Sequence, residues 1–387
     1  VQEQLQAGEN IMKTRAAVLT RTGAAAPYAD SRPLEIWEVG LAPPGPGEVL
    51  VKVAGAGVCH SDLSIINGDR PRDTPIVLGH EAAGVIQALG EGVTDLAVGD
   101  HVVMLFVPGC GNCQPCAEGR PVLCEPAGQA GVAGTLLSGA RRLSRNGQPI
   151  SHFVGVSAFA EHAVLSRRGV HRIDKSVPLE LAALFGCAVM TGVGAVANTA
   201  RVSPGQSVAV VGLGGVGLSS VMGAAAAGAA RVVAVDLNAD KLAMARDFGA
   251  TDTVNAGDED AVKQVRELTG GGVDHAFEMV GSAKALEMAY RITRRGGQTV
   301  TAGLPSSAQA ISLPVWHLVA EERTLKGCYM GSCVPRRDID RYLALHAAGR
   351  LPVDRLVTGH LTLDQINEGF DRLARGEAIR QIIRMEA

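Results

Sequence analysis

Hydrophobic residues follow two different patterns along the chain, and the pattern changes near Thr191. Before about Cys187, short apolar runs such as Glu48–Val53 are separated by turn signals such as Pro43–Gly47. Runs of this length, bounded by Gly and Pro, are typical of short β-strands. The sequence therefore predicts a mainly β first domain with few helices.

A second region begins at Ser207, where short apolar strands alternate with helical segments. This alternation predicts a parallel sheet covered by helices, which places the chain in the α/β class. Six strands agree with a doubly wound, Rossmann-type dinucleotide-binding fold. The predicted strands are Val208–Val211, Val232–Val235, Thr253–Asn255, Val273–Phe277, Gln298–Thr301 and Thr324–Tyr329.

The chain has 387 residues, enough for two domains. We expect the mainly β domain at 12–188, the parallel-sheet domain at 189–330, and a return at 331–387 that completes the first domain. Residues 1–11 precede Met12-Lys13-Thr14-Arg15, which resembles a natural start. They are therefore expected to be an appended or disordered lead.

The charge is balanced, with 36 Lys and Arg against 39 Asp and Glu, and no long run has one sign. This argues against nucleic acid or an acidic membrane as the main partner. Val208–Ala230 is almost wholly apolar, but its glycines and Ser219–Ser220 favour a buried strand, a turn and a helix over a membrane span. No secretion signal is evident, so a cytoplasmic location is expected.

A glycine motif follows the first strand of the second region. The run Gly212-Leu213-Gly214-Gly215-Val216-Gly217 matches G-x-G-x-x-G and opens a helix, as a dinucleotide site requires. Asp236 ends the next strand, 24 positions after Gly212, close to the ~20 typical of such sites. A carboxylate there accepts hydrogen bonds from the ribose and repels a 2′-phosphate, which favours NAD over NADP. Lys241 is also expected to reach this ribose.

Eight cysteines are present, and four of them crowd into the run Cys110-x-x-Cys113-x-x-Cys116-x₇-Cys124. Four thiolates in one short loop can surround a tetrahedral Zn²⁺ and leave no open position, which predicts a structural zinc site. Free thiols or an iron–sulfur cluster are the alternatives, and nothing else in the sequence suggests electron transfer. Cys59, His80 and Cys187 are scattered, and no spacing rule distinguishes a metal site from core packing there.

Several motifs occur together in one order: Gly79-His80-Glu81-Ala82-Ala83-Gly84, the four-cysteine run, Gly186-Cys187, and the glycine motif with Asp236. Together they resemble the zinc-containing medium-chain alcohol dehydrogenases, from Met12 to the C-terminus. The segment Gly134–His152 is similar to that of the liver-type branch. The resemblance implies a GroES-like first domain, NAD, two Zn²⁺ per chain, and a homodimer or homotetramer assembled through Pro314–Met330.

The resemblance also implies individual roles. Cys59, His80 and Cys187 would bind the catalytic zinc, with Asp62 and Glu81 beside them, and Ser61 would take the alcohol proton. Ser64 stands where relatives often carry a His that releases this proton, so that step stays open. Further cofactor contacts would come from Thr191, from His60 and Arg380 at the phosphates, and from main-chain groups near Ala302, Cys328 and Met330 at the nicotinamide. The substrate pocket would include Phe106, Phe153 and Val154, which also fit plain core packing.

The expected activity is reversible hydride transfer between NAD and primary alcohols, either medium-chain or aromatic. A related branch oxidises the glutathione adduct of formaldehyde and carries an Arg shortly after the fourth cysteine, but Glu125–Gly134 has no basic residue. A non-catalytic, zinc-stabilised NAD-binding protein is a third alternative. Asp236 and the cysteines argue against a fourth, a zinc-free quinone or enoyl reductase.

Overall fold

The computed structural model describes residues 11–385, which form two compact units. Unit 1 comprises Val1–Gly186 and Val357–Ala387, and unit 2 comprises Cys187–Leu356. The lead expected at 1–11 lies, apart from Ile11, outside the described residues.

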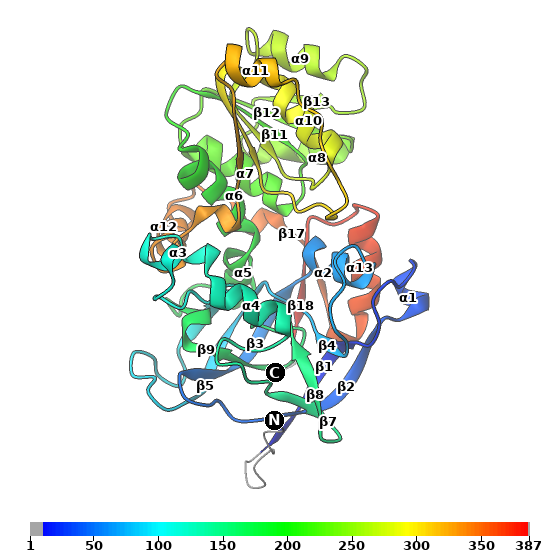
Figure 1. Cartoon of the computed structure of the whole chain (residues 1–387), viewed down its shortest axis with the longest axis vertical. Coiled ribbons are helices and arrows are strands. Elements are labelled where there is room, and N and C mark those ends of the chain that lie inside the picture. The colour runs from blue at the N-terminus through cyan, green and yellow to red at the C-terminus, as the bar shows by residue number, and fades with distance from the viewer. Residues whose placement is uncertain (1–10, 386–387) are drawn as a thin grey trace. The chain divides into compact units, whose positions relative to one another are not determined.

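Unit 1 contains a small closed barrel and a larger sheet (Figure 1). The barrel order is β1-β2-β7-β8-β4, and it closes because β4 also pairs with β1. The barrel strands are β1 Met12–Leu19, β2 Leu34–Leu41, β4 Ile76–Val77, β7 Leu143–Arg145 and β8 Gln148–His152.

The larger sheet has the order β10-β6-β5-β3-β18-β17, with β9 also paired to β3. Alternate residues Val49, Val51 and Val53 of β3 are buried in the unit's core, as expected for a strand with one face toward the core. The strands are β3 Glu48–Gly57, β5 Ala82–Leu89, β6 His101–Met104, β9 His162–Ser166, β10 Val170–Ile173, β17 Val357–Leu361 and β18 Arg380–Arg384.

The helices of unit 1 are short, as the sequence predicts for a mainly β domain. They are α1 Tyr28–Ser31, α2 His60–Ile66, α3 Gln114–Ala117, α4 Glu125–Ala133, α5 Leu179–Ala183 and α13 Ile366–Ala374, with 3-10 turns η1 Pro121–Leu123, η2 Arg167–Gly169, η3 Leu184–Gly186 and η8 Leu363–Gln365.

Unit 2 is built on a six-stranded parallel sheet with the order β13-β12-β11-β14-β15-β16. Residues 208–211 are buried, as is typical of a parallel strand covered on both faces. The predicted doubly wound α/β fold is confirmed. The strands are β11 Ser207–Val211, β12 Arg231–Asp236, β13 Asp252–Asn255, β14 Val273–Glu278, β15 Thr293–Thr301 and β16 Thr324–Gly327.

Helices flank this sheet in Figure 1. They are α6 Ala188–Gly194, α7 Gly215–Ala226, α8 Ala239–Ala245, α9 Ala261–Leu268, α10 Ala283–Ile292, α11 Val315–Ala320 and α12 Pro335–Ala347, with the π-helix η4 Ala195–Ala200 and the 3-10 segments η5 Arg246–Phe248, η6 Met330–Ser332 and η7 Val353–Leu356.

The apolar segment Val208–Ala230 forms β11, a turn and α7, as predicted. Within residues 11–385 no single helix is long and apolar enough to cross a membrane, and one bent pair, Leu179–Gly186 with Ala188–Ala200, passes by length and composition alone.

The chain returns to unit 1 later than the expected residue 331. Residues 331–356 belong to unit 2. The reason is α12, which packs against α6 and carries Asp338 and Tyr342 within hydrogen-bond distance of Asn198. The last strand of the parallel sheet is also shorter than predicted, because β16 ends at Gly327 and not at Tyr329.

Candidate metal and cofactor sites

Four cysteines of unit 1 converge as the sequence predicts. The Sγ atoms of Cys110, Cys113, Cys116 and Cys124 all lie within 4.8 Å of one another. The loop stays tight because α3 begins directly after Cys113 and α4 directly after Cys124. This set has the donor chemistry of a closed, structural Zn²⁺ site.

Backbone N–H groups prepare this loop for a cation. The N–H groups of Asn112 and Cys113 lie 3.4 and 3.3 Å from Cys110 Sγ and donate to it. They lower the pKa of the Cys110 thiol to about 6. The Cys110 N–H in turn donates to Cys124 Sγ at 3.2 Å. Burial instead raises the pKa of the Cys116 thiol to about 12 and also raises that of Cys124. Because metals bind thiolates rather than thiols, Cys110 is the thiol of this loop that is best prepared for a metal near neutral pH.

A second group brings together the scattered residues Cys59, His80 and Cys187. One ligand atom of each lies within 4.8 Å of the others, and all three side chains are buried. Cys59 precedes α2, and Cys187 follows η3, whose Gly186 has no room for a Cβ beside the Met104 carbonyl of β6. Three ligands leave a fourth tetrahedral position for a water or substrate oxygen, which is the pattern of a catalytic zinc site.

His80 is fixed by the carboxylate of Asp62 behind it. Asp62 Oδ1 lies 3.2 Å from His80 Nδ1 and also accepts the N–H of Gly79 at 3.0 Å. Burial disfavours protonation of His80, but Asp62 and Cys59 outweigh it and raise its pKa well above the usual value. With Nδ1–H donated to the carboxylate, Nε2 is left as the metal-binding nitrogen.

Glu81 and Arg380 form a buried ion pair, with Arg380 Nε 3.3 Å from Glu81 Oε1. Gly57 lies beside this ion pair. A side chain at this position would overlap the Glu81 carboxylate, so only glycine fits while the carboxylate holds this position. The resemblance implied a phosphate contact for Arg380. The structure instead shows its guanidinium engaged with Glu81, and the phosphate contact remains a prediction.

The expected proton pathway lies along α2. Ser61 lies on this helix, and its carbonyl accepts a hydrogen bond from Arg70 at 3.2 Å. The hydroxyl of Ser64 donates to the carbonyl of His60 at 2.9 Å, one turn earlier. The Ser64 hydroxyl proton is therefore engaged in a hydrogen bond to the helix backbone. The side chain of His60 is exposed.

Two aromatic rings stand edge-on to the metal histidine. The Phe106 ring centroid is 5.2 Å from that of His80, and the Phe153 centroid is 5.7 Å away. Both phenylalanines, with Val154, also pack on the core of unit 1. The core packing expected of all three residues is therefore present, and their role in a substrate pocket remains a prediction. Val154 has φ 47°, which is strained for a β-branched residue.

The glycine turn of unit 2 has the geometry of a phosphate site. Gly212 has φ 94° and no room for a side chain beside Val280, and Gly217 packs against the Gly212 carbonyl. Gly214 precedes α7, so Gly215 and Val216 form the first turn, whose N–H groups suit an anion. The carboxylate of Asp236 accepts the Leu213 N–H at 2.6 Å. Asp236 therefore also holds the turn in shape.

Other expected cofactor residues of unit 2 lie near the carboxyl ends of its strands or on α6. Ala302 follows β15, and its N–H donates to the Glu278 carbonyl at 3.0 Å. Lys241 lies in the first turn of α8. Thr191 on α6 is buried, as are Cys328 and Met330 after β16.

Sequence reasoning missed Glu278, whose buried carboxylate accepts the N–H groups of Val280 and Gly281 and the hydroxyl of Thr301 at 2.6–2.7 Å. It thereby fixes the two loops that follow β14 and β15. A usable signal was present, because Glu278 ends its strand as Asp236 ends β12, at the edge of a parallel sheet where ligands bind.

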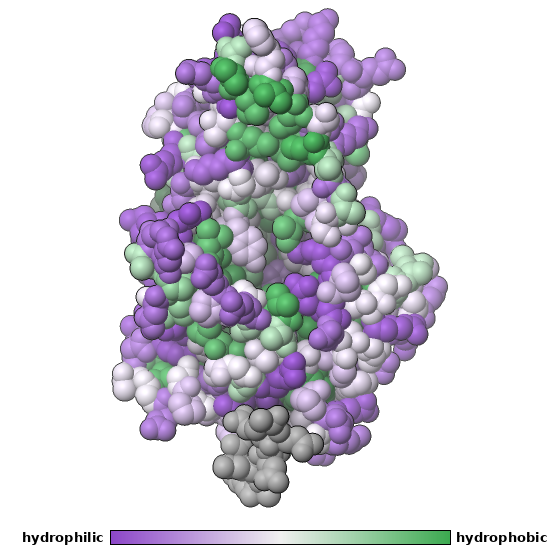
Figure 2. Space-filling view, in the orientation of Figure 1, coloured by the Kyte–Doolittle hydropathy of each residue, from purple (hydrophilic) through white to green (hydrophobic). Residues whose placement is uncertain are grey.

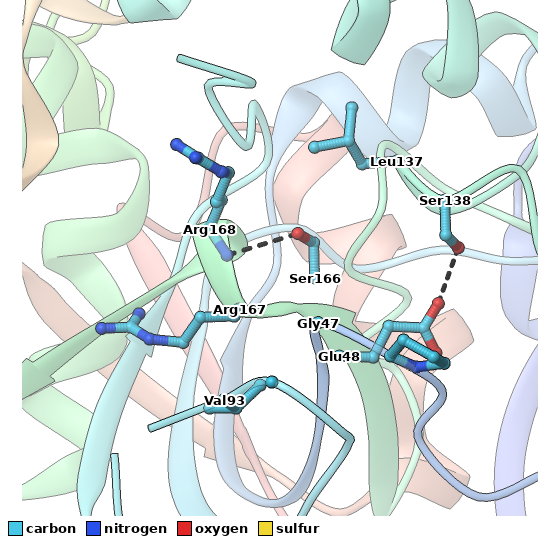
Figure 3. A pocket seen from close by; sticks show the side chains of 10 residues that line it. Gly47, Glu48, Val93, Leu137, Ser138, Ser166, Arg167 and Arg168 are labelled. Carbon is cyan, nitrogen blue, oxygen red and sulfur yellow. Dashed lines mark hydrogen bonds between the residues drawn. The ribbon is translucent and has the colours of Figure 1, made fainter. Parts of the chain in front are cut away.

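A pocket elsewhere in unit 1 contains none of the expected site residues (Figure 3). Glu48, which lines it, pairs with Arg142 at 2.8 Å and accepts the Ser138 hydroxyl at 2.6 Å. Arg167, also in the lining, pairs with Asp95 at 2.6 Å. Because these charges are neutralised locally, the pocket shows no chemistry comparable to the two cysteine-containing clusters.

Two family profiles match the chain: "Alcohol dehydrogenase GroES-like domain" over residues 45–175 and "Zinc-binding dehydrogenase" over residues 215–348. Proteins named S-(hydroxymethyl)glutathione dehydrogenase, from Escherichia coli O6:H1 and Shigella sonnei, are 41% identical over 377 residues. These alignments cover 96% of this chain and 100% of each relative.

Solved structures are similar over nearly the whole chain. An alcohol dehydrogenase zinc-binding domain protein from Burkholderia ambifaria is 35% identical with a TM-score of 0.92, covering 98% of this chain and 100% of its own. Benzyl alcohol dehydrogenase from Acinetobacter calcoaceticus is 32% identical with a TM-score of 0.90, covering 97% and 100%. A zinc-binding dehydrogenase from Sinorhizobium meliloti 1021, bound to NADP, is 25% identical with a TM-score of 0.77, covering 96% and 99%.

Fold and clusters together define a zinc-dependent dehydrogenase. The chain belongs to the zinc-containing medium-chain alcohol dehydrogenase family, as these comparisons show. It is an oxidoreductase that uses NAD, and the two cysteine-containing clusters account for two zinc ions per chain.

Proposed function

We propose that the protein catalyses reversible hydride transfer between NAD and primary alcohols, with medium-chain and aromatic alcohols as the preferred class. The carrying observation is the three-ligand group Cys59, His80 and Cys187, with the rings of Phe106 and Phe153 edge-on to His80. Three ligands leave room for one oxygen, and the rings suit an apolar group attached to it.

Zinc bound by the three ligands would supply the Lewis acidity that makes a hydroxyl acidic near neutral pH, and bound NAD would supply the hydride acceptor. The residues of the chain do the rest. Cys59, His80 and Cys187 hold the metal, and Asp62 keeps the His80 ring in one orientation. The Ser61 hydroxyl relays the alcohol proton, accepting it while passing its own proton on toward solvent. Phe106 and Phe153 bind the apolar part of the alcohol and keep water away from it.

The thiol adduct of formaldehyde is the second candidate substrate, because the 41% identical relatives are named for it. That adduct carries carboxylates and requires cationic partners. Helix α4, Glu125–Ala133, follows the fourth cysteine and has no Lys or Arg. This composition favours the simple alcohols.

Initial rates of NADH formation distinguish the two substrates. The panel should contain ethanol, hexanol, benzyl alcohol, and formaldehyde with and without glutathione. Turnover of hexanol and benzyl alcohol without thiol is the expected result. Activity confined to formaldehyde plus glutathione would replace the proposal with the second candidate.

Zinc content addresses the non-catalytic alternative. Two equivalents per chain are expected, and Cys113→Ser should lower zinc content by removing the structural ion while leaving the three-ligand group intact. A wild-type protein with one equivalent and no turnover of any alcohol would favour a zinc-stabilised NAD-binding protein.

We also propose a homodimer formed through the segment Pro314–Met330. Strand β16 is an edge of the unit 2 sheet, and edge strands readily pair with another chain. On the adjoining α11, Trp316 and Val319 are 75% and 77% exposed, and Figure 2 shows an apolar patch over this helix. A second copy would cover both features.

Sedimentation velocity at micromolar concentration should show a dimer, and Trp316→Glu should shift it to monomer. A monomeric wild-type protein would contradict this arrangement.

A further inference from the structure

Two segments that carry proposed NAD contacts, α6 with Thr191 and η6 with Met330, touch each other backbone to backbone within unit 2. At Gly194 a Cβ would lie 2.6 Å from the Gly331 carbonyl oxygen, and at Gly331 it would lie 2.8 Å from the Gly194 Cα. A side chain at either glycine would force the segments apart. The position of Met330 is therefore tied to that of α6.

Segment η6 has an unusual backbone. Met330, Gly331 and Ser332 have φ of 47°, 67° and 49°, so three consecutive residues lie in the left-handed region. For a residue other than glycine this region is sterically unfavourable, because Cβ approaches the following carbonyl oxygen. Such a run persists only where surrounding contacts over-determine it, so the partners of η6 decide whether Met330 keeps its conformation.

Asn198 and Thr199 on η4 provide those contacts. Asn198 Nδ2 lies 3.3 Å from the Gly331 carbonyl oxygen, and Thr199 Oγ1 lies 2.8 Å from Ser332 Oγ. Adjacent residues of a regular α-helix do not face one another, whereas η4 is a π-helix, a rare form frequent at functional sites. Here both neighbours reach η6.

The amide of Asn198 is held in one orientation. Arg337 Nη2 lies 3.4 Å from Asn198 Oδ1 and donates to it, which directs the NH₂ group the other way. That NH₂ group also lies 3.2 Å from the buried carboxylate of Asp338, which pairs with Arg337 at 2.6 Å. A carboxylate accepts and a guanidinium donates, so the opposite orientation of the amide would face both partners wrongly.

We propose that Asn198 is a positioning residue for the nicotinamide half of NAD, acting through the carbonyl of Gly331 on the left-handed turn that carries Met330. Asn198 touches neither substrate nor cofactor in this arrangement. It fixes the backbone on which the nicotinamide contacts lie, while the glycine turn at Gly212–Gly217 holds the pyrophosphate independently. The inference rests on the proposed function with NAD, and on the nicotinamide contact that the family resemblance implies for Met330.

The test compares two ligands that share the ADP-ribose half. NADH carries the nicotinamide, whereas ADP-ribose lacks it. Calorimetric titration of zinc-loaded wild-type protein and Asn198→Ala should show an approximately tenfold rise in Kd for NADH, and less than a twofold change for ADP-ribose. Gln264→Ala serves as the control, because it truncates an amide on α9 whose bonds are to Asp258 and Asp260 at the surface.

A milder variant guards against loss of folding in Asn198→Ala. Ser332→Ala removes the hydroxyl contact to Thr199 at an exposed position and should weaken NADH in the same selective way, about threefold. Equal weakening of both ligands, or no change in either, would overturn the inference. Failure of the wild-type protein to bind ADP-ribose and NADH would instead overturn the proposed cofactor site, and the inference with it.

Discussion

The carboxylate of Asp62 lies 3.2 Å from Nδ1 of His80 and is itself completely buried. The same carboxylate accepts the N–H of Gly79, so it fixes both the ring and the backbone that carries it. A charge buried this deeply is stabilised only by such partners. The zinc ligand and its supporting acid therefore form one unit.

Asp62→Asn should lower zinc affinity at the three-ligand group by about 10–100-fold, because a histidine loses the carboxylate that orients it. Zinc content after dialysis against graded chelator is the measurement, and it should fall from two equivalents toward one. Asp95→Asn is the matched control, since it neutralises an exposed carboxylate paired with Arg167. Retention of both ions at wild-type chelator concentrations would contradict the role of Asp62.

Asp236→Asn should reduce kcat/KM for NAD about tenfold and improve the ratio of NADP to NAD turnover. The substitution removes the charge that repels a 2′-phosphate, and it weakens the contact that holds the Leu213 N–H. Steady-state kinetics with both cofactors is the measurement. Asp240→Asn, on the adjoining first turn of α8, controls for loss of a nearby charge. An unchanged ratio would show that Asp236 only supports the turn.

Phe106→Ala should lower kcat/KM for benzyl alcohol about tenfold and leave ethanol within about threefold, because a lost apolar contact worth roughly 1.5 kcal/mol acts only on the larger alcohol. The comparison variant is Phe159→Ala. Phe159 is fully buried, and its ring centroid lies 6.0 Å from that of Phe370. Its loss should therefore cost about 3–5 kcal/mol of unfolding free energy. Phe159→Ala should leave the ratio of kcat/KM for benzyl alcohol to kcat/KM for ethanol unchanged. Similar ratios in both variants would remove Phe106 from the pocket.

His152 should make the fold less stable in acid. Burial, and then the nearby Arg141 and Arg142, lower its pKa to about 3, while its Nε2 accepts the Arg142 N–H at 3.0 Å. Above about pH 6.5 the imidazole is neutral in both the folded and unfolded states. As pH falls from 6.5 toward 3, only the unfolded state binds the proton, so stability falls by up to about 1.4 kcal/mol per pH unit.

The measurement for His152 is urea unfolding of wild-type protein and His152→Gln between pH 7 and pH 4. Glutamine offers an oxygen to the same N–H and does not titrate. The variant should therefore lose less stability than wild type across this range. Parallel losses in the two proteins would mean that other groups account for the acid sensitivity.

Much of the fold follows from the sequence because parallel strands are apolar over their whole length. The predicted strands coincide with β11 to β14 to within one residue at each end. Strand β15 begins at Thr293, five residues before the predicted Gln298, because Arg294, Arg295 and the adjoining glycines carry no apolar signal. Pairing with β14 through a register shift makes this polar start a strand.

The metal and cofactor sites differ in how much of each could be predicted from local sequence. The four-cysteine loop is visible from spacing because its ligands are close in sequence, and the structure brings them together. Cys59, His80 and Cys187 are joined only by folding, so spacing could not connect them and the family resemblance was needed. The proposed role of Asn198 depends on the π-helix η4 and on its contacts with α12, which lies far along the chain. No local pattern encodes either.

The strained backbone at Val154 gives the proposed wall of the substrate pocket a separate importance for protein engineering. Holding a β-branched residue at φ 47° costs on the order of 1–3 kcal/mol, and glycine or asparagine would accept this conformation more easily. A library at Val154 would then recover thermal tolerance from relaxed variants, and the same variants would lose the isopropyl surface that shapes the wall beside Phe153. Selection for heat resistance and selection for substrate discrimination would consequently move this one position in opposite directions.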